Sequence, residues 1–264
     1  MHFRIRDLAA DRCVWSFPPV DTVPVKLRCR MLAVRAFNAN DMTVGEDKLI
    51  PVFRALERFD YGGIGREIDR LASSHTDPRD FVHQAALPLM RTVGDRWHQG
   101  KCSIAQEHML TRQLTAFLSA LIQDYRRATP PARILIATPR NELHEFPILA
   151  AAMLAVVGGL GVVYAGSDLP AADIVLAANR SDAVAVLLSL STAPDAETLE
   201  ELSYITRALP RSTSLWLGGP QEISLEGYWT GSRWVMLHDF FSLEKQYATL
   251  GGWFGEGRTA RQPV

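Results

Sequence analysis

Between residues 129 and 256, short apolar runs alternate with helical segments, and this alternation limits the possible folds more than any other feature. The first run, Ala132–Ala137, is almost entirely apolar, which is typical of a strand buried on both faces of a sheet. Gly166–Pro170 is predicted as a turn into a helix over Ala171–Arg180. The predicted strands cover residues 132–137, 161–165, 183–189, 214–217 and 234–237. The alternation predicts an α/β fold with a parallel five-stranded sheet, Rossmann-like (flavodoxin-like) in its winding.

Residues 49–128 carry apolar side chains at the three- and four-residue spacing of helices. Tyr61-Gly62-Gly63 predicts a break, Asp77-Pro78 predicts a helix start, and Pro88 predicts a kink. Ser103 with Gln106 forms a capping-box pattern at the start of the last helix. The predicted helices cover residues 49–59, 64–71, 78–97 and 104–125. Four helices with short loops predict a small four-helix bundle that caps the following domain.

The segments outside these two domains show no regular pattern. Phe17-Pro18-Pro19 and Val23-Pro24 favour an irregular N-terminal arm packed on the bundle over a partner-binding element. The expected domains are an arm over 1–48, the four-helix bundle over 49–128, the Rossmann-like domain over 129–256 and a tail over 257–264.

Composition excludes several functional classes. The formal net charge is -1, so no global basic field attracts nucleic acid or an anionic membrane. The three cysteines follow no metal-ligand or disulfide spacing, which suits a reducing compartment, and no apolar run reaches the roughly 18 residues of a membrane span. We therefore expect a cytoplasmic protein. Neither a glycine-rich dinucleotide fingerprint nor a phosphate-binding lysine loop follows the first strand, which argues against nicotinamide cofactors and nucleoside triphosphates.

Distinctive residues follow the predicted strands, where ligands bind in parallel sheets. Glu142 and His144 follow the first strand, and a carboxylate two residues from an imidazole is a suitable arrangement for a transition-metal ligand. The simpler interpretation is a loop histidine that is hydrogen-bonded at a helix start. One protein ligand is nevertheless sufficient where a macrocycle supplies the other bonds to the metal. Taken alone, Trp97 is simply a core residue of the bundle, and Glu107-His108 is a solvated first helical turn. If the bundle lies over His144, the same residues fit the upper face of a tetrapyrrole site.

These residues carry a family resemblance that covers about residues 49 to 255. Trp97, nine intervening residues and Glu107-His108 resemble a motif of the cobalamin-dependent light-sensing regulators, the CarH-like branch of the MerR-type repressors. The cobalamin-binding Rossmann domain has three signatures, acid-x-His-x-x-Gly, Ser-x-Leu and Gly-Gly. The segments that resemble them here are Glu142-Leu143-His144-Glu145-Phe146-Pro147, Ser189-Leu190-Ser191 and Gly218-Gly219.

The resemblance implies a role for each residue. His144 would be the lower axial ligand to cobalt, oriented by Glu142, and Trp97 and Glu107 would cover the upper axial group, typically 5′-deoxyadenosyl. In the light sensors, light cleaves the cobalt-carbon bond and an upper histidine then ligates cobalt; His108 is the candidate here. The residues expected to line the slot for the displaced nucleotide tail are Ser189, Ser191, Gly218 and Gly219.

The sequence departs from the family pattern at three points. Pro147 stands where the family has glycine, and Ser191 stands where it has leucine. Proline adds bulk and removes a backbone donor beside the lower ligand. The family's DNA-reading winged-helix domain is not recognisable before Leu49, so we expect no direct DNA binding.

These observations predict a stand-alone cobalamin-binding photoreceptor or regulatory module, not an enzyme, that signals to a protein partner; a homo-oligomer stays open. One alternative is a photoreceptor that holds biliverdin, a linear tetrapyrrole, in the same slot. Cys102 is then a conceivable thioether site, although an inert loop thiol is the simpler interpretation. The enzymatic alternative is a corrinoid methyl carrier of a methyltransferase system, a class that lacks the tryptophan, glutamate and histidine cap.

Overall fold

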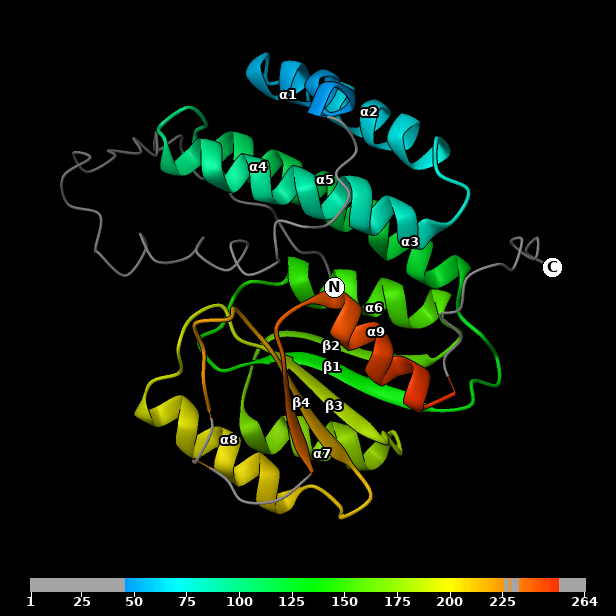
Figure 1. Cartoon of the computed structure of the whole chain (residues 1–264), viewed down its shortest axis with the longest axis vertical. Helices are drawn as coiled ribbons and strands as arrows, with labels where there is room; N and C mark the ends of the chain where they lie inside the picture. Colours follow the sequence, from blue (N-terminus) through cyan, green and yellow to red (C-terminus); the bar gives the residue numbers. More distant parts are fainter. Residues whose placement is uncertain (1–45, 226–227, 229–232, 252–264) are drawn as a thin grey trace, which may run out of the picture.

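The computed structural model describes residues 46–225, 228 and 233–251, and within them a helical part is stacked on an α/β part (Figure 1). The predicted tail over 257–264 lies outside the described residues, as does the predicted arm up to residue 45. Helices α1 (Ile50–Glu57) and α2 (Tyr61–Ser73) form the outermost layer, and the longer helices of the helical part lie between them and the sheet (Figure 1).

The predicted break at Tyr61-Gly62-Gly63 is wrong, because these residues form the first turn of α2. Asp60 caps this helix, and its side chain accepts a hydrogen bond from the main-chain nitrogen of Gly63 at 2.8 Å. A Cβ atom at Gly63 would lie 2.3 Å from the Asp60 carboxylate, so the close cap requires a glycine. The chain turns one step earlier, at Phe59, whose φ of 53° is left-handed.

The predicted third helix is one continuous helical run with a widened turn. It consists of α3 (Pro78–Phe81), the π-helical segment η5 (Val82–Ala86) and α4 (Leu87–His98). The main-chain nitrogen of Leu87 donates to the carbonyl of Val82, five residues back. Pro88 has no N–H and its ring needs room in the preceding turn, so the chain widens there. The last helix of this part, α5 (Ile104–Asp124), has the predicted capping box of Ser103 and Gln106.

The α/β part is a parallel sheet with the strand order β2-β1-β3-β4-β5 among the described residues. This flavodoxin-like order confirms the predicted fold class, and it reverses direction between β1 and β3, where ligands bind in such sheets. Helices α6 and α9 cover the face toward the helical part, and α7 and α8 cover the other (Figure 1). The bounds are β1 Arg133–Pro139, α6 Phe146–Val157, β2 Gly161–Leu169, α7 Ala171–Arg180, β3 Ala185–Ser189, α8 Ala196–Ala208, β4 Ser214–Gly218, β5 Trp234–Leu237 and α9 Phe240–Thr249.

The predicted turn at Gly166–Pro170 is wrong, because β2 continues to Leu169 and pairs there with Pro139 of β1. Two register shifts interrupt this pairing. Gly166 and Asp168 take positive φ values of 88° and 63° at these irregularities, so turn-forming residues serve as bulges within a strand. The extension of β2 therefore reaches the loop that follows β1.

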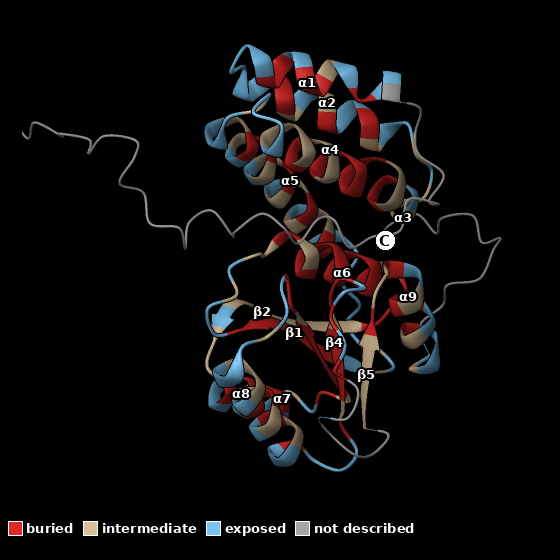
Figure 2. Ribbon diagram, turned by 60° about the vertical axis from the view of Figure 1, so that its left-hand side comes forward, coloured by how far each residue is buried: buried red, intermediate tan, exposed pale blue. Residues whose placement is uncertain are grey.

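The helical part and the α/β part share one hydrophobic core. Buried side chains run without a break from α1, α4 and α5 through α6 to the facing side of the sheet and α9 (Figure 2). A second, smaller core lies between the opposite face of the sheet and α7 and α8. Because α6 contributes to both the bundle and the sheet, the two parts pack as a single body.

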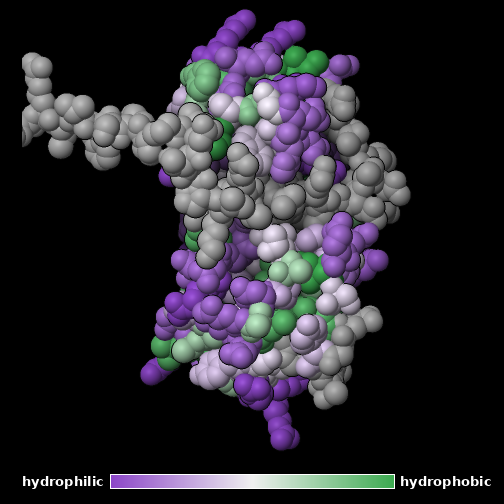
Figure 3. All heavy atoms as spheres, turned by 90° about the vertical axis from the view of Figure 1, so that its left-hand side faces the viewer, coloured by the Kyte–Doolittle hydropathy of each residue, from purple (hydrophilic) through white to green (hydrophobic). Residues whose placement is uncertain are grey.

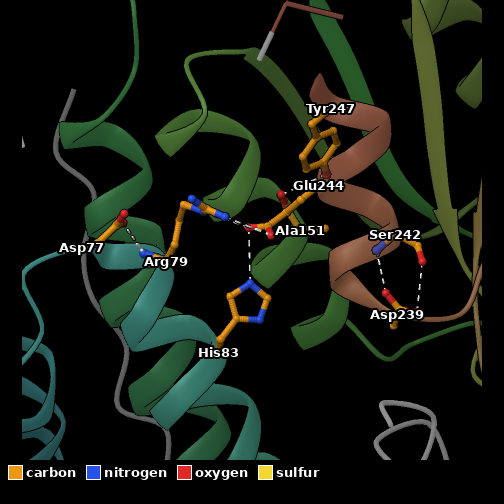
Figure 4. Close-up of polar contacts among 8 residues, drawn as sticks. All are labelled: Asp77, Arg79, His83, Ala151, Asp239, Ser242, Glu244 and Tyr247. Atoms are coloured by element: carbon orange, nitrogen blue, oxygen red, sulfur yellow. Dashed lines mark hydrogen bonds and ion pairs between the residues drawn. The ribbon is translucent and has the colours of Figure 1, made fainter. Parts of the chain in front are cut away.

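A second contact between the helical part and the α/β part is a largely buried ion cluster that joins α3 and η5 to α9 (Figure 4). The Glu244 carboxylate of α9 accepts hydrogen bonds from Arg79 Nε at 3.0 Å and Arg79 Nη2 at 3.2 Å, and lies 3.3 Å from His83 Nε2. The Glu244 side chain is only 5% exposed. Burial raises the pKa of Glu244, but the hydrogen bonds and charges of His83 and Arg79 lower it by more, so its net pKa lies below the ordinary value.

We expect Glu244→Gln to destabilise the protein at neutral pH by about 3 kcal/mol, because the half-buried Arg79 loses its two-point contact with the carboxylate. The ionised form of Glu244 stabilises the fold above its unfolded-state pKa, and this contribution is lost as the pH falls through the lower folded-state pKa. The difference in unfolding free energy between wild type and variant therefore shrinks below about pH 4.5. Urea titrations from pH 3 to pH 7 measure it; a difference that does not change with pH would contradict this account.

Candidate functional site

The loop between β1 and α6 presents His144 with one ring nitrogen fixed and the other free. Its Nδ1 lies 2.6 Å from Glu142 Oε1, and the main-chain nitrogen of His144 donates to the same oxygen at 2.9 Å. A carboxylate accepts, so Nδ1 carries the proton and Nε2 keeps its lone pair. Nε2 is buried and has no hydrogen-bond partner among the described residues. A buried lone pair without a donor is the arrangement expected of a metal-ligating imidazole, and the carboxylate fixes its tautomer.

The second oxygen of Glu142 is held by Ser191. Its Oε2 accepts hydrogen bonds from the main-chain nitrogen of Ser191, at 2.7 Å, and from the Ser191 hydroxyl. Burial raises the pKa of Glu142, but the hydrogen bonds from His144 and Ser191 lower it by more, so the carboxylate stays ionised. Ser191, predicted for the tail slot, is thus placed behind the carboxylate that orients His144.

Three residues that the sequence analysis did not single out hold the loop in place. The buried Thr138 donates from its hydroxyl to the carbonyl of Glu142 and accepts from the main-chain nitrogen of Asp168 at 2.9 Å. The Asp168 side chain accepts from the main-chain nitrogen of Asn141 at 2.7 Å. Asn141 and Asp168 have φ values of 66° and 63°, a conformation that these two residue types tolerate better than most. The β2 extension therefore clamps the backbone that carries Glu142 and His144.

An apolar groove lies at the carboxyl ends of β3, β4 and β5, between α6 and α9. Its empty volume is about 480 Å³, including the part open to solvent. Three of the residues predicted for the tail slot, Ser189, Gly218 and Gly219, line this groove, whereas Ser191 does not. Pro147 lines it too, in the first turn of α6, where a helix does not need the missing N–H. A Cβ atom at Gly219 would lie 3.0 Å from the carbonyl oxygen of Leu190, so this wall is closely packed.

The residues predicted for the upper face gather around the turn between α4 and α5. Trp97, in the last turn of α4, is half-buried and packs edge-on against His98, with 4.8 Å between ring centroids. Glu107 is buried, and its two oxygens lie 2.5 Å from His108 Nδ1 and 2.6 Å from the Thr111 hydroxyl. The His108 side chain is 69% exposed. Glu107 is therefore a buried anchor for His108, not the solvated first-turn acid of the simpler interpretation.

The upper residues and the His144 loop lie on one side of the molecule. The α4–α5 turn and the start of α6 are at the same end of their layers (Figure 1), which is also the end where the strands finish. On this face, apolar side chains collect in the α/β half among hydrophilic ones (Figure 3). The fold thus places an imidazole at the mouth of the sheet and an aromatic, acid and imidazole set above it.

Cys102 lies in the same α4–α5 turn and is half-buried. Burial raises the pKa of its thiol, and the nearby Glu107 carboxylate raises it further. A raised pKa lowers the thiolate fraction and therefore the nucleophilicity of this cysteine. The environment favours the inert-thiol interpretation over a thioether link to a bilin.

Comparison with known proteins finds a B12-binding family model and a transcriptional repressor. Residues 51–122 match the family model described as a B12 binding domain. The HTH-type transcriptional repressor CarH of Myxococcus xanthus is 30% identical over 172 residues, which are 62% of this chain and 55% of CarH. The chain thus spans about half the length of this relative. The match to a B12 binding domain supports a cofactor-binding module.

A solved structure shares the fold. The monomethylamine corrinoid protein of Methanosarcina barkeri superposes with a TM-score of 0.56 at 13% identity, covering 78% of this chain and all of that one. The methanol:cobalamin methyltransferase complex MtaBC of the same organism gives a TM-score of 0.37 at 13% identity, covering 84% of both chains. In the described part of the chain, no helix is long and apolar enough to cross a membrane.

We expect Thr138→Val to destabilise the fold by about 1–3 kcal/mol, because the isosteric side chain leaves buried groups of the loop without their hydroxyl partner. Thr138→Ser keeps the hydroxyl and is the matched control. Urea unfolding of both variants measures the difference. Equal stability of the two would show that the clamp on the Glu142 carbonyl is not needed.

Proposed function

We propose that the chain binds a cobalamin between its helical and α/β parts and acts as a regulatory module. The observation that carries this proposal is His144 Nε2, a buried lone pair without a partner whose ring is fixed from behind by Glu142. The match to a B12 binding domain supports it. His144 would be the lower ligand to cobalt, and Trp97 would cover the upper face.

The two histidine–glutamate pairs have the same local geometry. In each, Nδ1 lies within 2.6 Å of a carboxylate oxygen, which leaves Nε2 as the atom available to a metal. They differ in exposure, since the His144 side chain is 19% exposed and that of His108 is 69% exposed. We therefore assign His144 as the permanent ligand and His108 as the exchangeable one. Ser189, Gly218 and Gly219 would line the slot for the nucleotide tail.

When bound, the cofactor would supply a cobalt centre with a light-sensitive organometallic bond. His108 would offer Nε2 as a second protein ligand, and Glu107 would hold the ring in the tautomer that leaves Nε2 free. A shift of the α4–α5 turn would change a surface seen by a protein partner, as a two-state element biased by a local bond does. CarH, similar over part of its length, is named as a transcriptional repressor, which supports a role in regulation.

The methyl-carrier alternative rests on the shared corrinoid-protein fold. A carrier must expose the upper face to its methyltransferases. The buried Glu107 and half-buried Trp97 on that side favour a covered face and hence a sensor. The biliverdin alternative loses its thioether argument because of the raised pKa of Cys102.

The wild-type protein mixed with adenosylcobalamin in the dark is expected to show a His-on spectrum, with the lower base of the cofactor replaced by an imidazole. We expect His144→Ala to lose this spectrum and weaken binding by about tenfold or more, because the only lower ligand is removed. Absorbance titrations measure both. An unchanged free-cofactor spectrum with wild type, or a red-absorbing product after addition of biliverdin, would overturn the cobalamin assignment.

Green illumination tests the upper residues separately. His108→Ala is expected to leave the dark spectrum unchanged and to alter only the illuminated product, because His108 is outside the lower coordination site. His75→Ala, just after α2 and away from the α4–α5 turn, is the matched control. If His108→Ala and wild type give the same illuminated spectrum, the exchangeable-ligand role is wrong.

A further inference from the structure

The Arg79–His83–Glu244 cluster connects the groove at the sheet edge with the helix that carries Trp97. On the groove side, Phe240 and Leu243 of α9 and its N-cap residue Asp239 line the groove. Glu244 is the next residue, and its side chain points away from α9 towards the helical part (Figure 4). Any displacement of α9 by an occupant of the groove therefore moves the carboxylate that holds the helical part.

On the cap side, Arg79 and His83 lie near the start of the helical run from Pro78 to His98. At about 1.5 Å per residue this run is roughly 30 Å long, and Trp97 lies at its far end. A small rotation at the anchored end is thus amplified at Trp97. His83 itself lies in the π-helical segment, where the helix is already widened.

The geometry of the cluster fixes the orientation of α3 relative to α9 as well as the distance between them. Arg79 donates through Nε and Nη2 to both oxygens of Glu244, and this planar two-point contact defines the angle between the two helices. The His83 ring is stacked on Phe241 of α9 at 4.6 Å and 8°, which restricts rotation further. Buried ion pairs are costly to desolvate and contribute little net stability, so orientation is the more specific role for this one.

We propose that Glu244 is a positioning residue that sets the angle of the Pro78–His98 helical run and thereby holds Trp97 over the face of the corrin opposite His144. The proposal rests on the proposed function. Glu244 acts through Arg79 and His83 and does not touch the cofactor. Glu244 also links an occupant of the apolar groove to the position of Trp97, because α9 carries both residues of the groove lining and the Glu244 carboxylate.

Hydrogen–deuterium exchange on the full chain tests the proposal, with and without hydroxocobalamin. We expect wild type to gain protection in the Leu87–His98 segment when the cofactor binds. Glu244→Gln should lose most of that gain, with amide exchange faster by about tenfold in this segment, while the His-on spectrum reporting on His144 is kept. Glu67→Gln, which removes an exposed ion pair with Arg70 on α2, is the matched control and should behave as wild type.

A conservative variant keeps the test decisive if Glu244→Gln does not fold. Arg79→Lys retains the positive charge but loses the two-point contact, so it should reproduce the loss of protection if orientation is the role. Wild-type protection in the cofactor-bound form of either folded variant would overturn the positioning role alone. Absence of any His-on spectrum with wild-type protein would instead overturn the proposed function on which it rests.

Discussion

The candidate site depends on one interaction, the contact between the buried carboxylate of Glu142 and the imidazole of His144. Burying a charged carboxylate is unfavourable unless its oxygens are satisfied, and here Ser191 and the main-chain nitrogen of His144 add their hydrogen bonds to the contact with the ring. The result is an ionised acid that holds the ring with Nε2 free. The clamp of Thr138 and Asp168 keeps the loop backbone in the conformation that makes this contact possible.

Local sequence signals predicted most of the fold. The apolar runs, the capping box at Ser103 and the cap at Asp77 act within a few residues, and the helix predicted over Ala171–Arg180 has the bounds of α7. The errors at Gly62-Gly63 and Gly166–Pro170 have a common reason. Glycine and aspartate signal a change in backbone direction, but whether that change ends an element, caps it or forms a bulge within it depends on partners elsewhere in the fold.

The candidate site was predictable only where its contacts are local. The Glu142–His144 pair follows from a two-residue spacing, whereas the contact of Ser191 with Glu142 joins residues 49 positions apart, and no spacing rule could supply it. The Glu107–Thr111 contact at i and i+4 on one helix had a readable signal that was missed. Glu244 had none, because its partner Arg79 lies 165 residues away.

The difference in burial between the two histidine–glutamate pairs indicates which histidine would be the upper ligand and which the lower ligand of the proposed site. Both pairs present Nε2, so coordination chemistry alone does not distinguish the upper ligand from the lower one. His144 is enclosed by a loop that is clamped to two strands, while His108 projects into solvent from the second turn of a helix. A ligand that must move is better placed on the exposed pair, since its displacement leaves no buried lone pair without a partner. In the proposed site, the upper side would therefore be where a change of ligand costs least, and the helices that carry His108 would be the ones to signal the change.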